Sequence, residues 1–209
     1  MGKDMTLYSA SDMAKLGCGD CAGCSSCCRG MGQSIVLDPY DIYHLQAVTG
    51  QTFGQLMQEK LELHVEDGLI LPSIRMQDDS DLCGFLGGDG RCVIHDHRPG
   101  LCRLFPLGRN YDESGLQYFL LEDACRKQNR TKVKIRKWLG IEALPQYECF
   151  LITWHDLRRK VQEQIAKRQE DDFTQKINIK FLEIFYQKPY DIKQDFYEQF
   201  DERRKVVNI

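Results

Sequence analysis

Cysteine placement constrains this chain more than any other feature, because five of its ten cysteines crowd into one short segment of a 209-residue sequence. That segment, residues 18–28, reads CGDCAGCSSCC. Gly, Ser and Ala fill the gaps, so it has few side chains with which to bury a core. The spacing favours metal ligation instead, because C-x-x-C lets two thiolates reach one ion while backbone amides hydrogen-bond the sulfurs.

A disulfide framework is the main alternative for an even number of cysteines. The sequence starts MGKDMTLYSASDMAK, without an apolar signal core, and so predicts a cytoplasmic protein whose thiols stay reduced. Bridges within the segment would be strained, most of all between the neighbours Cys27 and Cys28. No apolar run is long enough to cross a bilayer, so we expect no membrane partner.

The run C-x-x-C-x-x-C at Cys21, Cys24 and Cys27 matches the first three ligands of a ferredoxin-type cluster loop. Cys28 follows at once, without the three-residue gap and the proline of that loop, so a copy of the loop is excluded and a remote cysteine has to complete a site. In a helix, Cys21, Cys24 and Cys28 would share one face and Cys27 would turn away. Neither a two-knuckle zinc ribbon nor the radical S-adenosylmethionine triplet fits the spacing.

A second group of cysteines follows in residues 82–106, which read LCGFLGGDGRCVIHDHRPGLCRLFP. The GGDG stretch is turn chemistry between apolar segments and predicts a short hairpin with Cys83 on one strand and Cys92 on the other. Pro99 favours a short helix or turn that presents Cys102. The Phe-Pro pair behind it would end that element.

In this order the motifs resemble the YkgJ-type cysteine-cluster family, a CxxCxxCC domain proposed to chelate zinc or iron. The resemblance covers about residues 18–125. It implies metal or cluster binding through eight cysteines: Cys21, Cys24, Cys27, Cys28, Cys83, Cys92, Cys102 and Cys125. Cys18 and Cys149 lie outside the pattern. Some members are described as flagellin lysine N-methylases, and many are called iron–sulfur proteins.

Eight thiolates allow two four-ligand sites, one cluster beside a zinc ion, or one site with spare cysteines. Thiolates are soft ligands that suit zinc and iron–sulfur clusters alike. The triple run resembles cluster loops, and together with the family resemblance it favours iron–sulfur. Because eight cysteines already fill two sites, we interpret His95 and His97 as surface or hydrogen-bonding residues, not ligands.

Four arginines stand close in sequence to a cysteine: Arg29, Arg91, Arg98 and Arg103. Such side chains can neutralise thiolates or bind an anionic substrate. For Arg98 and Arg103 we favour structural contacts to carbonyls or carboxylates.

The chain divides into an irregular N-terminus at 1–17, a cysteine-cluster domain at 18–130 and a helical region at 131–209 packed on it. Together these predict an α+β fold with short hairpins, helices and a helical C-terminal extension. Asp38 with its following proline starts a helix, and Thr52 caps a second helix that we expect to reach Glu66.

Beyond these helices, a strand at 69–76 leads toward the cysteine hairpin, and 104–109 with 116–121 form another hairpin. The basic segment 126–137 is interpreted as a solvated helix start, so no nucleic-acid partner is predicted. Helices follow from Pro145 onward.

The last helix places three apolar residues at four-residue steps, namely Ile192, Phe196 and Phe200. We interpret this C-terminal region as core packing, with a surface for an unidentified protein partner as the alternative. The sequence does not set the oligomeric state.

Three functions remain open from the sequence. The first is a redox or cluster-carrying protein, and the second is a protein lysine N-methyltransferase, which would require S-adenosylmethionine. The third is an interaction module stabilised by zinc. No glycine-rich nucleotide loop supports the second. No catalytic residue is assigned, and metal binding is the function that the sequence favours.

Overall fold

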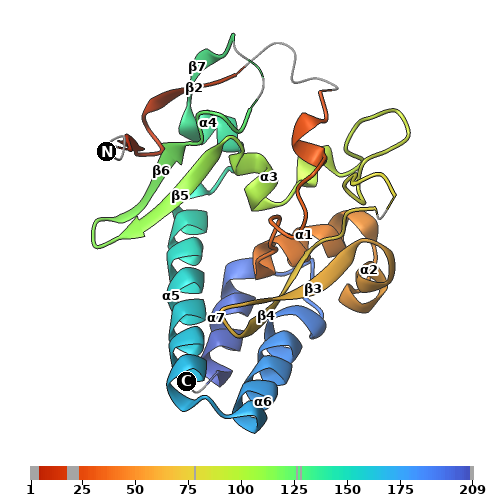
Figure 1. Ribbon diagram of the computed structural model, residues 1–209. Coiled ribbons are helices and arrows are strands. Elements are labelled where there is room, and N and C mark those ends of the chain that lie inside the picture. Colours follow the sequence, from red (N-terminus) through yellow and green to blue (C-terminus); the bar gives the residue numbers. More distant parts are fainter. Residues whose placement is uncertain (1–4, 18–23, 78, 126, 128, 208–209) are drawn as a thin grey trace.

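The computed structural model describes residues 5–17, 24–77, 79–125, 127 and 129–207 of the chain. In Figure 1 two of the short sheets and the cysteine-bearing loops form the upper part of the molecule, and a layer of helices with the third sheet against it forms the lower part. Helix α5 (Leu144–Arg168) runs from one part into the other. The structure confirms the predicted α+β fold with its short hairpins and helical C-terminal region.

A three-stranded antiparallel sheet lies at one end of α5. Strand β6 (Gly115–Leu120) pairs with β5 (Leu107–Asp112) on one side and with β1 (Leu7–Tyr8) on the other. The β5–β6 hairpin confirms the turn predicted between these segments, where Gly115 takes a φ of 106°.

A second ribbon joins the two ends of the cysteine domain. Strand β2 (Met13–Gly17) pairs antiparallel with β7 (Thr131–Lys134). The expectation of an irregular N-terminus is therefore wrong at β1 and β2. Buried and exposed side chains alternate along β2, as in a strand with one face on the core: Ala14 and Leu16 are buried, while Met13 and Lys15 are exposed.

The basic segment also differs from its prediction. Its described part forms strand β7 before the short helix α4 (Ile135–Leu139), so the segment is not simply the start of a helix. The lysines of β7 are exposed, so this part of the segment is solvated.

Helix α1 (Pro39–Thr49) begins where the sequence predicts. Asp38 caps it and exchanges hydrogen bonds with Asp41, and Pro39 takes the first position. Gly50 ends the helix in the left-handed conformation, with a φ of 67°.

The following helix is shorter than predicted. Helix α2 (Phe53–Glu59) has the expected capping box at Thr52, but it ends seven residues before Glu66. The intervening residues form β3 (Leu61–Glu66), which pairs with β4 (Leu69–Ile74). Asp67 and Gly68 both have positive φ, at 49° and 80°, and this is the geometry of a two-residue hairpin turn.

The helical layer is built around aromatic rings. Helix α5 packs against α6 (Asp171–Leu182), the π-helical turn η4 (Glu183–Gln187) and α7 (Phe196–Val206). Phe150 of α5 lies 4.8 Å from Phe200 and 5.1 Å from Phe196, measured between ring centroids. The last two rings confirm the predicted core packing, whereas Ile192 lies before the helix and is 52% exposed.

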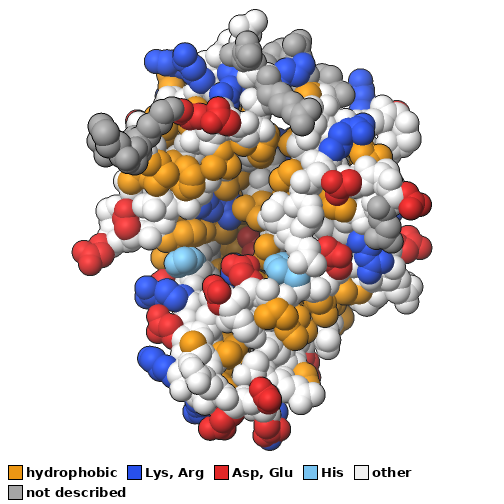
Figure 2. All heavy atoms as spheres, viewed as in Figure 1, with side chains coloured by type: hydrophobic (Ala, Val, Ile, Leu, Met, Phe, Trp, Pro, Cys, Tyr) orange, Lys and Arg blue, Asp and Glu red, His pale blue; other side chains and the backbone are white. Residues whose placement is uncertain are grey.

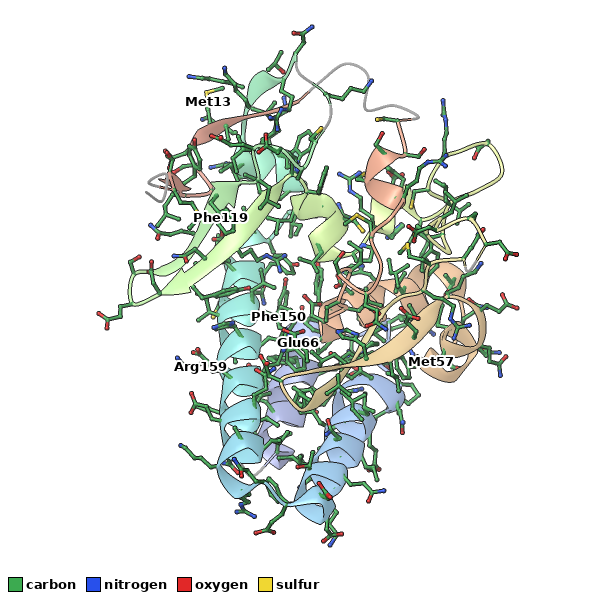
Figure 3. The ribbon with its side chains drawn as sticks, viewed as in Figure 1. Met13, Met57, Glu66, Phe119, Phe150 and Arg159 are labelled. Carbon is green, nitrogen blue, oxygen red and sulfur yellow. The ribbon has the colours of Figure 1, made fainter. Side chains whose placement is uncertain are left out.

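The tip of the β3–β4 hairpin is fixed to this layer by polar contacts. Figure 3 shows Glu66 at the end of β3 beside α5, where its Oε1 lies 2.8 Å from Arg158 Nη2. Asn178 of α6 accepts a 2.6 Å hydrogen bond from the Ile70 amide and donates to the Gly68 carbonyl at 2.9 Å. The Asn178 side chain thus pairs two backbone groups of the hairpin.

Replacing Asn178 with Ala should lower the free energy of unfolding by about 2–3 kcal/mol, because a backbone donor and acceptor lose their partner in a buried place. Urea unfolding followed by circular dichroism measures this change. Gln175→Ala removes an exposed amide from the same helix and should change the stability by less than about 0.5 kcal/mol. Equal midpoints for the two variants would contradict the assigned role of Asn178.

Candidate metal centre

The end of the first cysteine run is joined to the second group by backbone hydrogen bonds. Cys27 and Cys28 lie in a 3₁₀ turn, η2 (Ser26–Cys28), which starts after Ser25 at a left-handed φ of 37°. The Cys83 amide donates to the Cys28 carbonyl at 2.9 Å. A bridge between Arg29 and Leu82 extends this pairing, so two cysteine segments far apart in the sequence become neighbours.

The predicted hairpin between Cys83 and Cys92 is a tight loop with an isolated bridge rather than a pair of strands. The Gly87 amide donates to the Arg91 carbonyl at 2.8 Å, and Leu86 bridges to Cys92. This confirms the GGDG stretch as a turn. The loop brings Cys92 back beside Cys83.

Cys102 is placed by contacts from two distant helices. It lies in α3 (Gly100–Leu104), with Pro99 at the N-cap as predicted. The Gly100 amide donates to Asp41 Oδ1 of α1 at 2.7 Å. A methyl group at position 100 would overlap the Tyr147 hydroxyl of α5, so glycine is required there. Cys102 therefore depends on α1 and α5 for its position.

The thiols of the two groups influence one another electrostatically. Burial raises the pKa of Cys83, Cys92 and Cys102, and the charges of neighbouring cysteines raise each pKa further. Backbone amides act in the opposite direction, since the Phe85 N–H lies 3.4 Å from Cys83 Sγ and lowers the pKa of that thiol. Raised pKa values favour the protonated thiols, and a metal ion that binds them would have to displace these protons.

Cys27 and Cys28 form a pair in which one thiol is far more acidic than the other. The hydrogen bond from Cys28 lowers the pKa of Cys27 to about 6. Giving that hydrogen bond raises the pKa of Cys28 well above the ordinary thiol value. Cys27 is exposed and also raises the pKa of Cys83 and Cys92, so it faces the group instead of turning away.

Among the remaining predicted ligands, Cys24 lies near the group, since the charge of Cys27 raises its pKa. Cys24 hydrogen-bonds the Ser26 hydroxyl at 3.3 Å and lies near enough to Lys127 for that charge to lower its pKa. Cys18 and Cys21 lie outside the described residues. Cys149 is exposed on α5.

The five gathered thiols are not yet arranged around a single point. Within the described ranges, no three His, Cys, Asp or Glu side chains form a group that could hold a metal ion as they stand. The donor chemistry nevertheless fits a thiophilic metal, because several cysteine thiols lie near one another here and a backbone amide points at one of them. The eight-ligand assignment stays a prediction.

Comparison with known families agrees with this chemistry. The sequence model of the CxxCxxCC family, a domain proposed to chelate zinc or iron, matches residues 20–136. That match covers more than half of the chain. The protein belongs to the CxxCxxCC family. Comparisons with curated proteins and with solved structures give no match. No helix among the described residues is long and apolar enough to cross a membrane.

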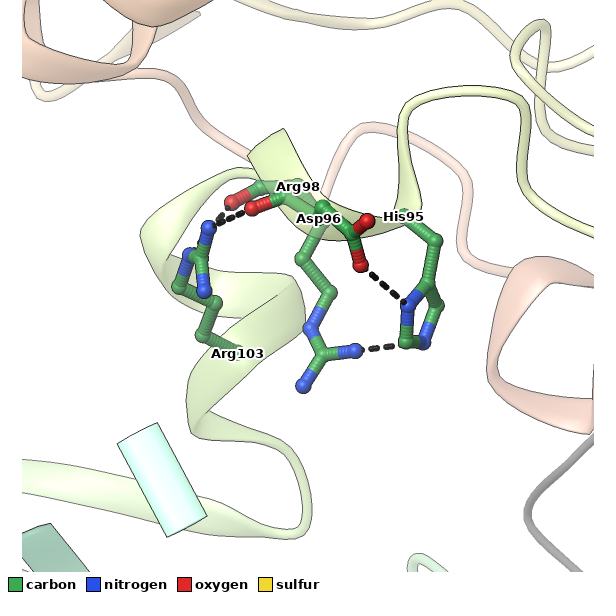
Figure 4. Close-up of polar contacts among 4 residues, drawn as sticks. All are labelled: His95, Asp96, Arg98 and Arg103. Atoms are coloured by element: carbon green, nitrogen blue, oxygen red, sulfur yellow. Dashed lines mark hydrogen bonds and ion pairs between the residues drawn. The ribbon is translucent and has the colours of Figure 1, made fainter. Parts of the chain in front are cut away.

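Arg103 has the structural role that the sequence predicts within this CxxCxxCC domain. Its Nε donates to the Arg98 carbonyl at 3.0 Å, and its Nη2 donates to the Asp96 carbonyl (Figure 4). These bonds fix the short turn η3 (His95–His97) onto α3. This guanidinium thus adds to the backbone hydrogen bonds that shape the connection between Cys92 and Cys102.

The structure also contains a cavity that sequence reasoning missed. It has a volume of about 310 Å³ and lies between the β5–β6 turn and α5, where the Tyr111 and His155 rings stack with centroids 4.0 Å apart. Figure 2 shows that this face of the molecule is hollowed, with charged and histidine side chains among apolar ones. No short motif marks the cavity, because its walls come from separate elements.

In chelator-treated, reduced protein, Cys27 should be the most rapidly alkylated thiol near neutral pH. Its pKa is lowered to about 6, so its iodoacetamide rate should rise through that pH and level off above it. The alkylation rate of an ordinary thiol keeps rising until about pH 8.5. Mass spectrometry of quenched samples gives the rate at each pH.

Cys28→Ala removes the thiol that donates to Cys27 and should move the alkylation profile of Cys27 to higher pH. Cys28→Ser keeps a donor and should move it less. Identical profiles in the wild type and in Cys28→Ala would show that the Cys27–Cys28 hydrogen bond does not control the reactivity.

Proposed function

We propose that the protein carries an iron–sulfur cluster on its cysteine centre and serves a redox or other cluster-dependent role. The observation that carries the proposal is that the Cys83–Cys28 backbone pairing and the Leu86–Cys92 bridge bring cysteines of separate segments near one another, namely Cys27, Cys28, Cys83, Cys92 and Cys102. A backbone amide directed at the Cys83 sulfur adds to it, since such N–H groups set the potential of protein-bound clusters.

The residues have distinct tasks in this proposal. The thiols hold the metal, and Cys21, Cys24 and Cys125 complete the ligand set that the family resemblance implies. Asp41 holds the segment that carries Cys102, and the Cys83 amide ties η2 to the second group. A bound cluster would supply one-electron transfer.

Zinc is the second candidate, because a tetrahedral site of four thiolates would use the same donors. Such an ion would fix the cysteine loops to the helices and leave the surface to bind a partner. The structure favours neither metal by ligand type, since both are thiophilic. Sulfide content and colour distinguish them.

The methyltransferase alternative has less support. The GGDG stretch is a turn closed by the Gly87–Arg91 hydrogen bond and does not precede a long helix, as a nucleotide-binding loop would. This alternative rests on the family resemblance alone, and a calorimetric titration with S-adenosylmethionine tests it directly.

Protein purified without oxygen should contain iron and matching sulfide, at roughly four irons per cluster, with a broad absorbance near ~400 nm that bleaches on reduction. Cys83→Ser and Cys102→Ser should lose most of this iron, because both positions lie within the gathered group. Cys149→Ser alters an exposed thiol on α5 and should keep it.

Zinc without sulfide or colour would overturn the iron–sulfur assignment and leave a zinc site. Protein that holds neither metal under these conditions would overturn metal binding altogether. Circular dichroism of each variant verifies that metal loss does not come from a failure to fold.

A further inference from the structure

The outer face of the β2–β7 ribbon carries lysines and no acid. Side chains at alternate positions of a strand share a face, and the pairing of the two strands places four exposed residues together on the outer side: Met13, Lys15, Lys132 and Lys134. Neither strand contains Asp or Glu. Figure 2 shows blue side chains at the end of the molecule where Figure 1 places β2 and β7. We call these four residues the lysine face.

Two of these lysines lie directly opposite each other, since Lys15 is the register partner of Lys132. Just beyond the ribbon the Ile135 amide donates to the Asp12 carbonyl at 3.0 Å. Hydrogen-bonded and non-hydrogen-bonded pairs alternate along an antiparallel ribbon, so the lysine pair is of the second kind, in which side chains come closest. Like charges in such a pair lower the stability of the ribbon.

The surroundings do not neutralise these charges. Within the described residues, neither hydrogen bonds nor ion pairs engage the ammonium groups of Lys15, Lys132 and Lys134. The acid next to the ribbon in sequence is Asp12, and one of its carboxylate oxygens accepts from the Ser9 amide and from the Ser9 hydroxyl, each at 2.8 Å. The ribbon thus keeps a repulsive arrangement that an anionic partner would relieve.

We infer that the lysine face binds an extended acidic segment of a partner protein, with Asp or Glu at every second position. Lys132 and Lys134 are two residues apart on one strand, so their Cα atoms are about 6.6–6.8 Å apart. Alternate residues of an extended segment have the same spacing, so successive acids would meet successive lysines. Lys15 adds a cation beside Lys132. This inference goes beyond the proposed metal binding and does not depend on which metal the cysteine centre holds.

Other polyanions match the lysine face less well. Single-stranded nucleic acid is bound through aromatic side chains on which the bases stack, and this face contains none. An anionic membrane would be attracted to the lysines, but stable attachment to a bilayer takes a second anchoring signal. Lysine side chains at strand spacing need only carboxylates at the same spacing, so the acidic segment is the partner that this surface favours.

The test measures the fluorescence anisotropy of a labelled peptide of alternating Glu and Thr, titrated with the full chain at low ionic strength. Lys132→Glu should weaken this binding by about 10-fold, because one attraction becomes a repulsion. The same variant should unfold at an equal or higher urea concentration than the wild type, since an opposite charge then faces Lys15. Weaker binding without lost stability separates a binding lysine from a structural one.

Lys160→Glu is the matched control, because it changes the net charge equally at an exposed lysine of α5. It should bind the peptide as the wild type does. Equal affinities for the two variants, or a wild type that does not bind the peptide, would overturn the inference. Tighter binding of oligothymidine or of phosphatidylserine vesicles than of the peptide would overturn the acidic segment as the partner. None of these results alters the metal and sulfide content, so the proposed function is tested separately.

Discussion

The buried carboxylate of Asp41 is the interaction on which the rest of the structure depends. One of its oxygens closes the cap of α1 by accepting from the Asp38 amide at 3.1 Å, and the other accepts from the Gly100 amide of α3. Burial raises the pKa of Asp41, and the neighbouring Asp38 raises it further. Isolated from partners, such a group would be strongly destabilising.

The environment of that carboxylate offsets this cost. Arg109 lies close enough to lower the pKa of both aspartates, and its Nη2 donates to the Tyr147 hydroxyl of α5 at 3.0 Å. Tyr186 of the helical layer donates to the Leu37 carbonyl just before α1. A continuous set of polar contacts therefore connects the aromatic core of the lower part to the segment that carries Cys102.

This connection explains why a cysteine-rich loop occurs in a chain with a full hydrophobic core. The short cysteine segments contribute few apolar side chains of their own, so they cannot fix four or more thiols by local packing. Their positions come from outside, through Gly100 at α3 and through the Cys83–Cys28 backbone pairing. The helical region that the sequence interprets as core packing thus has a second effect, because Tyr147 of α5 helps to fix the segment that carries Cys102.

Local signals in the sequence predicted local structure well. The caps at Asp38 and Thr52, the β5–β6 turn and the short helix at Cys102 each depend on residues within a few positions of one another. The extension of α2 was wrong because residues 61–66 contain apolar positions that fit both a helix and a strand, and pairing with β4 decided between them.

Contacts between distant segments could not be predicted from the sequence. The pairing of β2 with β7 joins residues more than 100 positions apart, and no short pattern encodes such a pairing. The cysteine spacing indicated the kind of site, but not that Cys27 faces the group, because the left-handed Ser25 ends any regular helix there. Likewise Arg98 and Arg103 look alike in sequence, and only the folded chain shows that Arg103 contacts carbonyls and Arg98 contacts the His95 ring.

Charge, as much as spacing, determines what this centre can hold. Four thiolates around a divalent cation leave a net charge of about −2, and buried charge of that size needs compensation. The Phe85 amide at the Cys83 sulfur and the positive charge of Arg98, which lowers the pKa of Cys92, act in this direction. Since zinc and an iron–sulfur cluster both leave the ligand shell negative, this compensation supports metal binding without selecting the metal. In the proposed function the choice of metal depends on the number of cysteines that bind it, because the charge of the ligand shell alone does not distinguish zinc from a cluster.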